Sequence, residues 1–318
     1  MAPTGADALT PLVAGQLASA CTWSDPARDE LVEALHRRHG KGVAAILLYG
    51  SYLRGKRDTM LDFYVLLENY GAMPSRWQAA LVWLLSPNVY QVRAGAPGQE
   101  TRAKYALMTM GRFAYAMRCD FHSYFWARFV QPSGLLYCRD ESARAAVVAA
   151  VADASRTFAR RVSPRLGNEF TARELVGRGL ALSYAAELRS EPAGHAVALH
   201  DHNAAYYEAL VSALAEEDRD FVKTAANGPD AVYQNLAGPA KRAMSQMAWA
   251  LRFVEGKALS ILRLLKAGLT FDGGFDYLLW KIERHSGVRV EASPRQRKYP
   301  LLFGWPVLFR LFRSGGFR

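Results

Sequence analysis

Two short apolar runs, close together in the first quarter of this 318-residue chain, constrain its fold more than any other feature. Residues 43–49 read VAAILLY and residues 61–68 read LDFYVLLE; Gly50-Ser51 and a polar loop, residues 54–59, separate them. Runs of this length between turn residues are typical of buried strands, because buried helices are usually longer. The pattern therefore predicts two strands connected like a hairpin at the start of a mixed sheet.

The rest of the chain changes from strand-like to helical patterning near residue 111. Before that point, residues 89–92 and 104–110 are predicted strands, and residues 75–85 are a predicted helix with a serine cap. After it, helical periodicity covers residues 140–162, 171–189, 202–215, 239–268 and 275–285. An Asp-Pro start after Ser24 predicts one more helix, with Leu31 and Leu35 on its apolar side.

These elements predict an α+β protein in which a mixed-sheet domain precedes a mainly helical one. The predicted segments are an N-terminal arm (1–26), the sheet domain (27–140), the helical domain (141–288) and a basic tail (289–318). Hydrophobic residues make up 51% of the chain, which is enough for a core and excludes a largely disordered protein.

The C-terminal tail concentrates the positive charge of the chain. Lys and Arg number 40 against 29 Asp and Glu, and residues 289–318 hold seven basic residues against one Glu. An excess of this size favours an anionic partner, whether nucleotide, nucleic acid or lipid headgroup. Apolar and aromatic residues lie between the charges, a pattern typical of segments that bind an anionic membrane surface. The alternative is a basic segment that packs on the protein itself. The predicted membrane contacts are Arg297, Lys298, Trp305, Phe309, Arg310, Phe312 and Arg313.

Composition also predicts where the protein works. No uninterrupted apolar run reaches 18 residues, and the first 27 residues contain no Lys or Arg, so neither a membrane span nor a basic targeting segment is expected. Three cysteines without metal-site spacing favour a reduced compartment. We therefore expect a cytoplasmic protein that is peripheral on the inner face of the cell membrane.

Residues 48–68 hold the pattern that bears most directly on chemistry. A strand that ends in Gly-Ser, followed by a loop and an Asp inside an apolar strand, is the layout of nucleotidyltransferases. Gly50 lets the backbone approach a phosphate, and Ser51 can donate its hydroxyl and N–H to phosphate oxygens. Asp62 is the predicted catalytic and Mg²⁺-binding carboxylate, and Lys56 and Arg57 are placed to screen a leaving pyrophosphate. The alternative is an ordinary strand and turn with a chance Asp.

The second metal ligand is missing from its usual place. Nucleotidyltransferases commonly have another acid two residues after the first, and Tyr64 stands there. Glu68 cannot replace it, because six residues of extended strand span about 20 Å. Asp58, Glu100 and Asp120 are weaker candidates for that ligand.

Two further basic residues are candidates for binding phosphate. Lys104 is a predicted catalytic residue, with a solvent-facing strand charge as the alternative. Arg128 lies in an aromatic-rich run, where its guanidinium can hold a phosphate with two hydrogen bonds or can serve as an ion-pair partner at a domain boundary.

Four segments in order resemble one enzyme family. TMLDFYVLLENY, preceded by LLYGS, resembles the mitochondrial-type phosphatidate cytidylyltransferases, the translocator assembly and maintenance protein family. The other three are Ala103-Lys104-Tyr105, residues 123–136 with matches at Arg128, Gln131 and Pro132, and residues 168–189. The likeness covers roughly residues 40–215. It implies a Mg²⁺-dependent enzyme that joins CTP to phosphatidic acid, releasing pyrophosphate and CDP-diacylglycerol. The family also has a single Asp in this strand, which accounts for Tyr64.

The chain departs from the family pattern at several places. Tyr52 stands where the family has Gly after Gly-Ser, Ala127 replaces another Gly, and the segment after the second strand is shorter. Two other functions stay open. One is nucleotidyl transfer to a soluble acceptor such as a sugar phosphate, a small alcohol or an RNA end. The other is a non-catalytic relative that binds nucleotide or lipid. No nucleic-acid recognition motif is present, so no nucleic-acid partner is expected.

Overall fold

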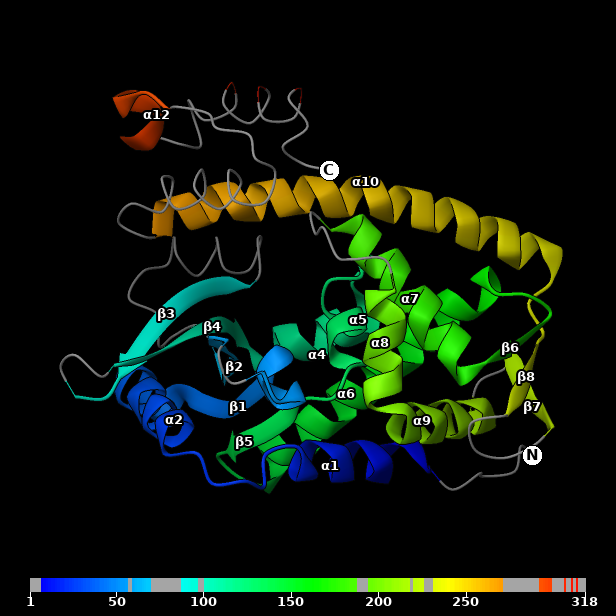
Figure 1. Ribbon diagram of the computed structural model, residues 1–318, viewed down its shortest axis with the longest axis horizontal. Coiled ribbons are helices and arrows are strands. Elements are labelled where there is room, and N and C mark those ends of the chain that lie inside the picture. The colour runs from blue at the N-terminus through cyan, green and yellow to red at the C-terminus, as the bar shows by residue number, and fades with distance from the viewer. Residues whose placement is uncertain are drawn as a thin grey trace. The chain divides into compact units, whose positions relative to one another are not determined.

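The computed structural model describes residues 7–56, 59–69, 87–96, 100–187, 194–217, 220–225, 231–270, 292–298, 306, 310 and 313 (Figure 1). The helices predicted at residues 75–85 and 275–285 lie outside these residues. Residues 1–183 and 192–252 form one compact unit, and residues 184–191 and 253–318 form a second. The predicted domain boundaries stay predictions.

A five-stranded sheet lies at the centre of the first unit. Its strand order is β3-β4-β2-β1-β5, and β2 and β4 run parallel while the other neighbours are antiparallel. The strands are β1 (Val43–Tyr49), β2 (Leu61–Leu67), β3 (Asn88–Ala94), β4 (Thr101–Thr109) and β5 (Gly134–Cys138). The predicted mixed sheet and the antiparallel pairing of its first two strands are confirmed.

Strand β5 was not predicted, because its five residues follow a run that reads as helical. That run forms helices α4 (Met110–Cys119) and α5 (Trp126–Phe129), after which the chain returns to pair with β1. The sheet therefore has one strand more than the four that the sequence predicted, and this strand lies within the predicted sheet domain, residues 27–140. The strand follows Ser133 directly and has only five residues, GLLYC, which are too few to show a clear period in sequence.

The first face of the sheet packs on the predicted N-terminal helix, α2 (Pro26–His39). Asp25 caps this helix by accepting a hydrogen bond from the Arg28 N–H at 3.2 Å. Leu31 and Leu35 are fully buried against alternate residues of β1 and β2, including Phe63. This face has a largely apolar core.

The second face packs on α4 and on α6 (Glu141–Val162). A helix near the N-terminus, α1 (Leu9–Ser19), packs on α6 and β5 and buries Leu9, Val13 and Leu17, so the predicted arm includes a core helix. The described part of this region also contains the 3₁₀ turns η1 (Gly40–Gly42), η2 (Ser51–Arg54) and η4 (Ser163–Arg165).

The region predicted to be mainly helical also contains a small sheet. Two helices match predicted helical stretches: α7 (Ala172–Ala186) and α9 (Ala204–Glu217). The helix between them, α8 (His195–His202), was not predicted. Strands β6 (Glu169–Thr171), β7 (Phe221–Ala225) and β8 (Val232–Asn235) form an antiparallel sheet in the order β6-β8-β7. The aromatic rings of Phe170, Phe221 and Tyr233 pack together within it. Strands of three to five residues are too short to show a clear period in sequence.

The chain continues into a 32-residue helix, α10 (Pro239–Thr270), and a short helix, α12 (Pro294–Lys298). Among the residues that the structure describes, no helix combines the length and apolarity needed to cross a bilayer. Of the predicted membrane contacts, Arg297 and Lys298 end α12, and Arg310 and Arg313 are exposed helical residues. The predicted contacts Trp305, Phe309 and Phe312 lie outside the described residues.

Candidate functional site

The turn after β1 brings Gly50 and Asp62 together. Gly50 has φ +94°, a backbone conformation that side chains disfavour, and it leads into η2. Tyr49 pairs with Asp62 across the hairpin, and a Cβ built on Gly50 would lie 3.5 Å from Asp62 Oδ2. The predicted phosphate-binding glycine and the predicted metal-binding carboxylate are therefore neighbours in space, with glycine leaving the approach open.

The loop after the turn folds back on itself. Ser51 Oγ lies 3.1 Å from Thr59 Oγ1, and the Thr59 hydroxyl donates to the Lys56 carbonyl at 2.8 Å. The Lys56 N–H donates to the Ser51 carbonyl at 3.3 Å, and the Lys56 side chain is exposed. Ser51 is thus held at the base of a closed loop. The other predicted loop residues, Arg57 and Asp58, lie outside the described residues.

Tyr52, which follows Gly50-Ser51 directly, anchors the turn to α2. Its ring is 8% exposed and belongs to the apolar core on the α2 face, and its hydroxyl donates to Asp25 Oδ2 at 2.6 Å. Burial acts to raise the pKa of Asp25, but the hydrogen bonds from Tyr52 and from the Arg28 N–H outweigh it, so the pKa is below its usual value. Sequence reasoning missed this contact, because the two residues lie 27 positions apart.

Lys104 lies next to Asp62 on the second face of the sheet. The parallel pairing of β2 and β4 sets Asp62 in register with Lys104, and side chains of residues in register point to the same face. Both side chains are half-buried. The predicted carboxylate and the predicted phosphate-binding ammonium therefore share one face on adjacent strands.

Arg128 from α5 reaches the same face through three tyrosine hydroxyls. Its Nη1 lies 2.9 Å from the hydroxyl of Tyr124, 3.1 Å from that of Tyr64 and 3.3 Å from that of Tyr49. Its guanidinium also stacks over the Tyr124 ring, 4.1 Å from the centroid. Tyr64 follows Asp62 by two residues, so both side chains point to the same side of β2.

Tyr64 does not act as a substitute acid. The residue is fully buried, and burial raises its pKa well above the usual range, with Arg128 acting in the opposite direction. The hydroxyl therefore stays protonated at neutral pH and accepts from Arg128. Where a second carboxylate is common, this chain has a neutral phenol that positions a cation, a role that the sequence pattern alone did not indicate.

The weaker candidates for a second acid are engaged elsewhere. The Asp120 carboxylate is buried, accepts from Arg112 at 2.8 Å and lies 3.3 Å from His122 Nε2. Glu100 lies 3.6 Å from Arg93 at the β3–β4 end. The buried Asp120 carboxylate is therefore held by its own partners, and Glu100 is part of an exposed ion pair.

The residues around Gly50 offer oxygen ligands of the kind that bind Mg²⁺. Asp62 supplies a carboxylate oxygen beside the open Gly50 backbone, and Ser51 supplies a hydroxyl on the next residue. Mg²⁺ is usually bound by one or two carboxylates together with substrate phosphates and water. These residues fit an ion that the protein holds jointly with a triphosphate.

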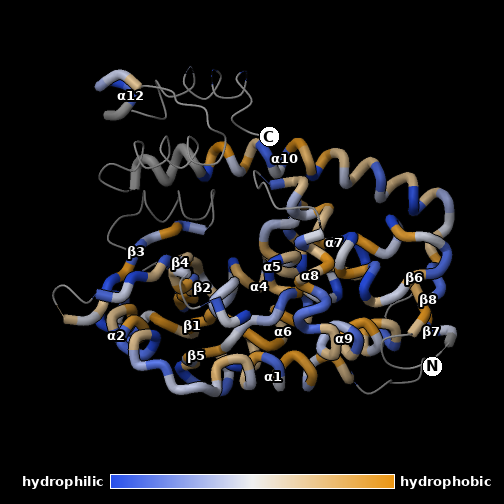
Figure 2. Tube along the Cα trace, viewed as in Figure 1, coloured by the Kyte–Doolittle hydropathy of each residue, from blue (hydrophilic) through white to orange (hydrophobic). Residues whose placement is uncertain are grey.

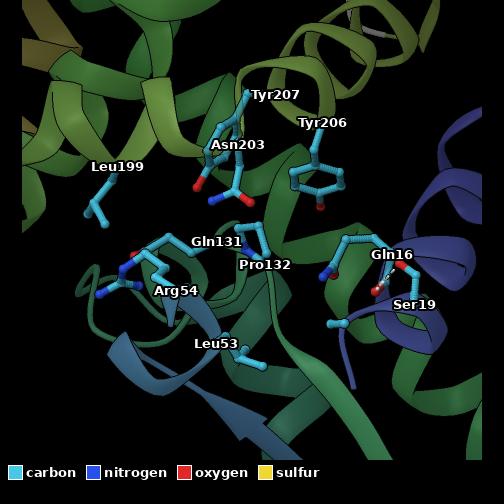
Figure 3. A pocket seen from close by; sticks show the side chains of 11 residues that line it. Gln16, Ser19, Leu53, Arg54, Gln131, Pro132, Leu199, Asn203, Tyr206 and Tyr207 are labelled. Atoms are coloured by element: carbon cyan, nitrogen blue, oxygen red, sulfur yellow. Dashed lines mark hydrogen bonds between the residues drawn. The ribbon is translucent and has the colours of Figure 1, made fainter. Parts of the chain in front are cut away.

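A pocket of about 230 Å³ opens beside the same turn (Figure 3). Its lining includes Leu53 and Arg54 of η2, Gln131 and Pro132 after α5, and residues of α1, α8 and α9: Gln16, Ser19, Ala20, Leu199, Asn203, Tyr206 and Tyr207. Arg54 is the one charged residue among these. The Tyr206 hydroxyl is buried with no hydrogen-bond partner among the described residues, and burial raises its pKa above the usual range.

The lining of this pocket consists mainly of hydrogen-bonding groups without a carboxylate, so it suits a polar or anionic group. Ligand pockets for whole drug-sized molecules are commonly about 300–1,000 Å³, so this one is large enough for part of a nucleotide. Gln131 and Pro132 are two of the residues on which the family likeness rests. Although they are far from Asp62 in sequence, they line this pocket beside the turn.

Comparisons with known proteins do not add a family assignment. Neither a scan against protein-family models nor a search of curated sequences finds a match to this chain.

Proposed function

We propose that this protein is a phosphatidate cytidylyltransferase, which makes CDP-diacylglycerol and pyrophosphate from CTP and phosphatidic acid. The observation that carries the proposal is the Asp62 carboxylate facing the positive-φ Gly50, with Lys104 in register beside it. A carboxylate, an open backbone turn and a cation on one face suit a magnesium–triphosphate complex. The ordered family likeness supplies the choice of CTP and phosphatidate.

The proposed reaction is one in-line displacement. A phosphate oxygen of phosphatidate attacks the α-phosphorus of CTP and forms a new P–O bond, and the bond from the α-phosphorus to the bridging oxygen breaks with its electrons going to pyrophosphate. The attacking phosphate monoester is already anionic near neutral pH, so no strong general base is needed. Positioning and charge stabilisation then supply most of the rate.

Each site residue has a defined part in this scheme. The Gly50 backbone and Ser51 hold phosphate oxygens, Lys104 and Arg128 offset the negative charge on them, and Lys56 and Arg57 screen the leaving pyrophosphate. Asp62 holds Mg²⁺, which when bound neutralises the triphosphate and polarises the α-phosphorus. Three tyrosines position Arg128 and keep it on the same face as Asp62.

The lipid substrate requires a surface that meets the membrane, and we assign this role to the basic tail. Phosphatidate stays in the bilayer while CTP stays in water, so an enzyme that joins them works at the interface. The exposed side chains of Arg310 and Arg313 support this assignment, since each basic residue near an anionic surface contributes about 1 kcal/mol. The proposed location is the inner face of the cell membrane.

The direct test incubates the full chain with labelled CTP, Mg²⁺ and phosphatidate vesicles and measures CDP-lipid. The Asp62→Asn variant keeps the size of the side chain and removes its charge, so we expect product formation to fall by about 1,000-fold. The matched control is Glu68→Gln, the same change at an exposed residue just after β2, which should leave the rate unchanged.

Two outcomes would redirect the proposal. Transfer to a water-soluble phosphate monoester, with no rate on phosphatidate, would identify a nucleotidyltransferase with a soluble acceptor. CTP binding without transfer to any of these acceptors would identify a non-catalytic relative. Flotation with vesicles, with and without residues 289–318, tests the tail separately from the chemistry.

A further inference from the structure

The pocket beside the site turn has no part in the transfer chemistry proposed above, yet it contains polar side chains that the chain itself does not engage. Arg54, Asn203 and Tyr206 have no side-chain hydrogen-bond or ion-pair partner among the described residues. The whole lining belongs to the first compact unit. The volume of about 230 Å³ is below that of sites for drug-sized molecules. The pocket therefore suits a small molecule, or one end of a larger one.

Arg54 supplies the positive charge of this pocket. Its side chain is half-buried on η2, and no carboxylate belongs to the lining. A cation that is partly removed from water without a counter-charge is unfavourable, so an anion that enters the pocket gains from this arginine. The guanidinium presents a planar set of donors that matches two oxygens of a phosphate or a carboxylate.

The charge around Arg54 favours a phosphate over a carboxylate. Residues 54–57 read RGKR, which places three basic residues within four positions, and Lys56 is exposed. A phosphate monoester carries about 1.5–2 negative charges near pH 7, whereas a carboxylate carries one. The more highly charged group gains more from a cluster of positive charges. We therefore expect the anionic end of the ligand to be a phosphate monoester.

The other side of the pocket offers uncharged hydrogen-bonding groups. Figure 3 shows Arg54 and Tyr206 on opposite sides, with Asn203 between them. The Tyr206 hydroxyl is buried without a partner among the described residues, although native structures pair nearly all buried polar groups. Burial raises its pKa above the usual range, so the hydroxyl stays protonated and can donate. The Asn203 amide offers both a donor and an acceptor.

Apolar side chains complete the lining. Leu53, Pro132 and Leu199 line the same pocket and offer contacts for carbon atoms. Figure 2 shows hydrophobic residues recurring along α1 and α9, the helices that border it. An apolar surrounding strengthens the interactions of the few polar groups within it. This lining fits a ligand that joins a phosphate to a short carbon skeleton with an uncharged oxygen.

We propose that this pocket binds an organic phosphate monoester, with its phosphate on Arg54 and an uncharged oxygen of its carbon skeleton on Tyr206 and Asn203. Two sources share this chemistry: a free monoester of the glycerol phosphate type, and the headgroup of phosphatidate. Arg54 follows Ser51 by three residues, which span at most about 11 Å, so the pocket borders the predicted phosphate turn. The assignment of the bound monoester as the acceptor of the transfer rests on the proposed function, but binding in the pocket does not.

The first test measures binding of glycerol 3-phosphate to the full chain by calorimetry, without CTP or Mg²⁺. We expect saturable binding that is tighter than that of inorganic phosphate, which lacks the carbon skeleton, and of glycerate, which has a carboxylate instead. Arg54→Gln should weaken the binding of glycerol 3-phosphate at least tenfold. The matched control is Arg178→Gln, the same change at an exposed arginine of α7, which should leave the affinity unchanged.

The second test separates binding from folding at Tyr206. Tyr206→Phe keeps the ring and removes the hydroxyl, so it should weaken glycerol 3-phosphate about tenfold and leave the affinity for inorganic phosphate unchanged. The melting temperature should stay the same or rise, because no described residue loses a hydrogen bond. Tyr115→Phe, which removes a hydroxyl from a side chain that is 59% exposed, is the control and should change neither quantity. Circular dichroism reports whether each variant folds.

The third test identifies the source of the monoester. Flotation compares vesicles that contain phosphatidate with vesicles that contain phosphatidylglycerol, an anionic diester. Preferential binding to phosphatidate that Arg54→Gln removes would identify the lipid headgroup. Binding of glycerol 3-phosphate without such a preference would identify a free monoester. Either result supports the pocket as a monoester site.

Three results would overturn the proposal. They are the absence of binding by both glycerol 3-phosphate and phosphatidate vesicles, equal binding by the Arg54→Gln variant, and binding that requires Mg²⁺ or is lost in Asp62→Asn. The last result would move the monoester from the pocket to the Gly50 turn. If the protein binds monoesters through Arg54 but transfers no nucleotide, the pocket stands and only its assignment to the acceptor fails.

Discussion

The two faces of strand β2 differ in a way that explains how one sheet serves both fold and site. Leu61, Phe63 and Val65 point to the α2 face, where they are at most 3% exposed in an all-apolar core. Asp62 and Tyr64 point to the other face, where a carboxylate, phenols and cations gather. Because side chains alternate along a strand, seven residues can supply both faces without mixing them.

The comparison shows that the polar face can be buried without a large loss of stability because its polar groups have hydrogen-bond partners. Burying an ionised or polar group without hydrogen bonds costs several kcal/mol. The hydrogen bonds from the Arg128 guanidinium to three tyrosine hydroxyls offset this cost. The apolar face needs no such arrangement, since burial alone stabilises it. Substitutions on the two faces should therefore affect different properties of the protein.

The largest expected effect on stability is on the apolar face. Phe63→Ala removes a fully buried ring from the α2-side core and should lower the free energy of unfolding by about 3–5 kcal/mol. Chemical denaturation monitored by circular dichroism measures it. Val89→Ala, which truncates a side chain 38% exposed in the same sheet, is the control and should cost less than about 1 kcal/mol. Equal losses for both variants would contradict the assigned core.

Tyr52 connects the turn at the site to the core on the α2 face, and its substitution should have an intermediate, pH-dependent effect. Tyr52→Phe leaves the Asp25 carboxylate without its 2.6 Å hydrogen bond and should cost about 2 kcal/mol at pH 7. The pKa of Asp25 is lowered in the folded protein, so its stabilising contribution is present above its unfolded pKa and is lost as pH falls through the folded value.

Unfolding curves at pH 7 and at pH 3 measure this linkage. The difference between Tyr52→Phe and the unsubstituted protein should shrink at the lower pH, as Asp25 takes up a proton. A difference that stays constant across this range would show that the hydrogen bond to ionised Asp25 is not its source.

The smallest expected effect on stability is at the site turn, where the effect on binding should be larger. Gly50→Ala forces a side chain into φ +94° and should cost about 1 kcal/mol of stability. Its new Cβ would lie 3.5 Å from Asp62 Oδ2, an ordinary contact that fills the space left open for phosphate. CTP affinity should fall at least tenfold, measured by calorimetry. Gly111→Ala, in α4 with open space around it, is the control.

The sequence was sufficient for the elements that local patterns determine. The limits of β1 match the predicted run, β2 ends one residue earlier, and α2 begins at the predicted cap because an Asp-Pro pair is a local signal. Asp62 beside Gly50 was also predictable, since a short hairpin-like connection brings the end of one strand to the start of the next.

The parts that the sequence did not predict depend on distant contacts. The pairing of β5 with β1 joins residues about 90 positions apart, and the contact between Arg128 and Tyr64 spans 64 positions. From the sequence, Tyr64 indicated only that the usual second acid is missing, because its role depends on the distant Arg128. The Tyr52 side chain reads as a departure from a family glycine until its bond to Asp25 is known. Local periodicity contains no information on any of these contacts.

The most direct measurement of the central claim is the Mg²⁺ dependence of CTP binding to the purified full chain. If Asp62 and the Gly50 turn hold a magnesium–triphosphate complex, calorimetry will show binding that requires Mg²⁺ and that Asp62→Asn weakens at least tenfold, while Glu68→Gln does not. Binding of equal strength without Mg²⁺, or equal binding by the Asp62→Asn variant, would contradict the account.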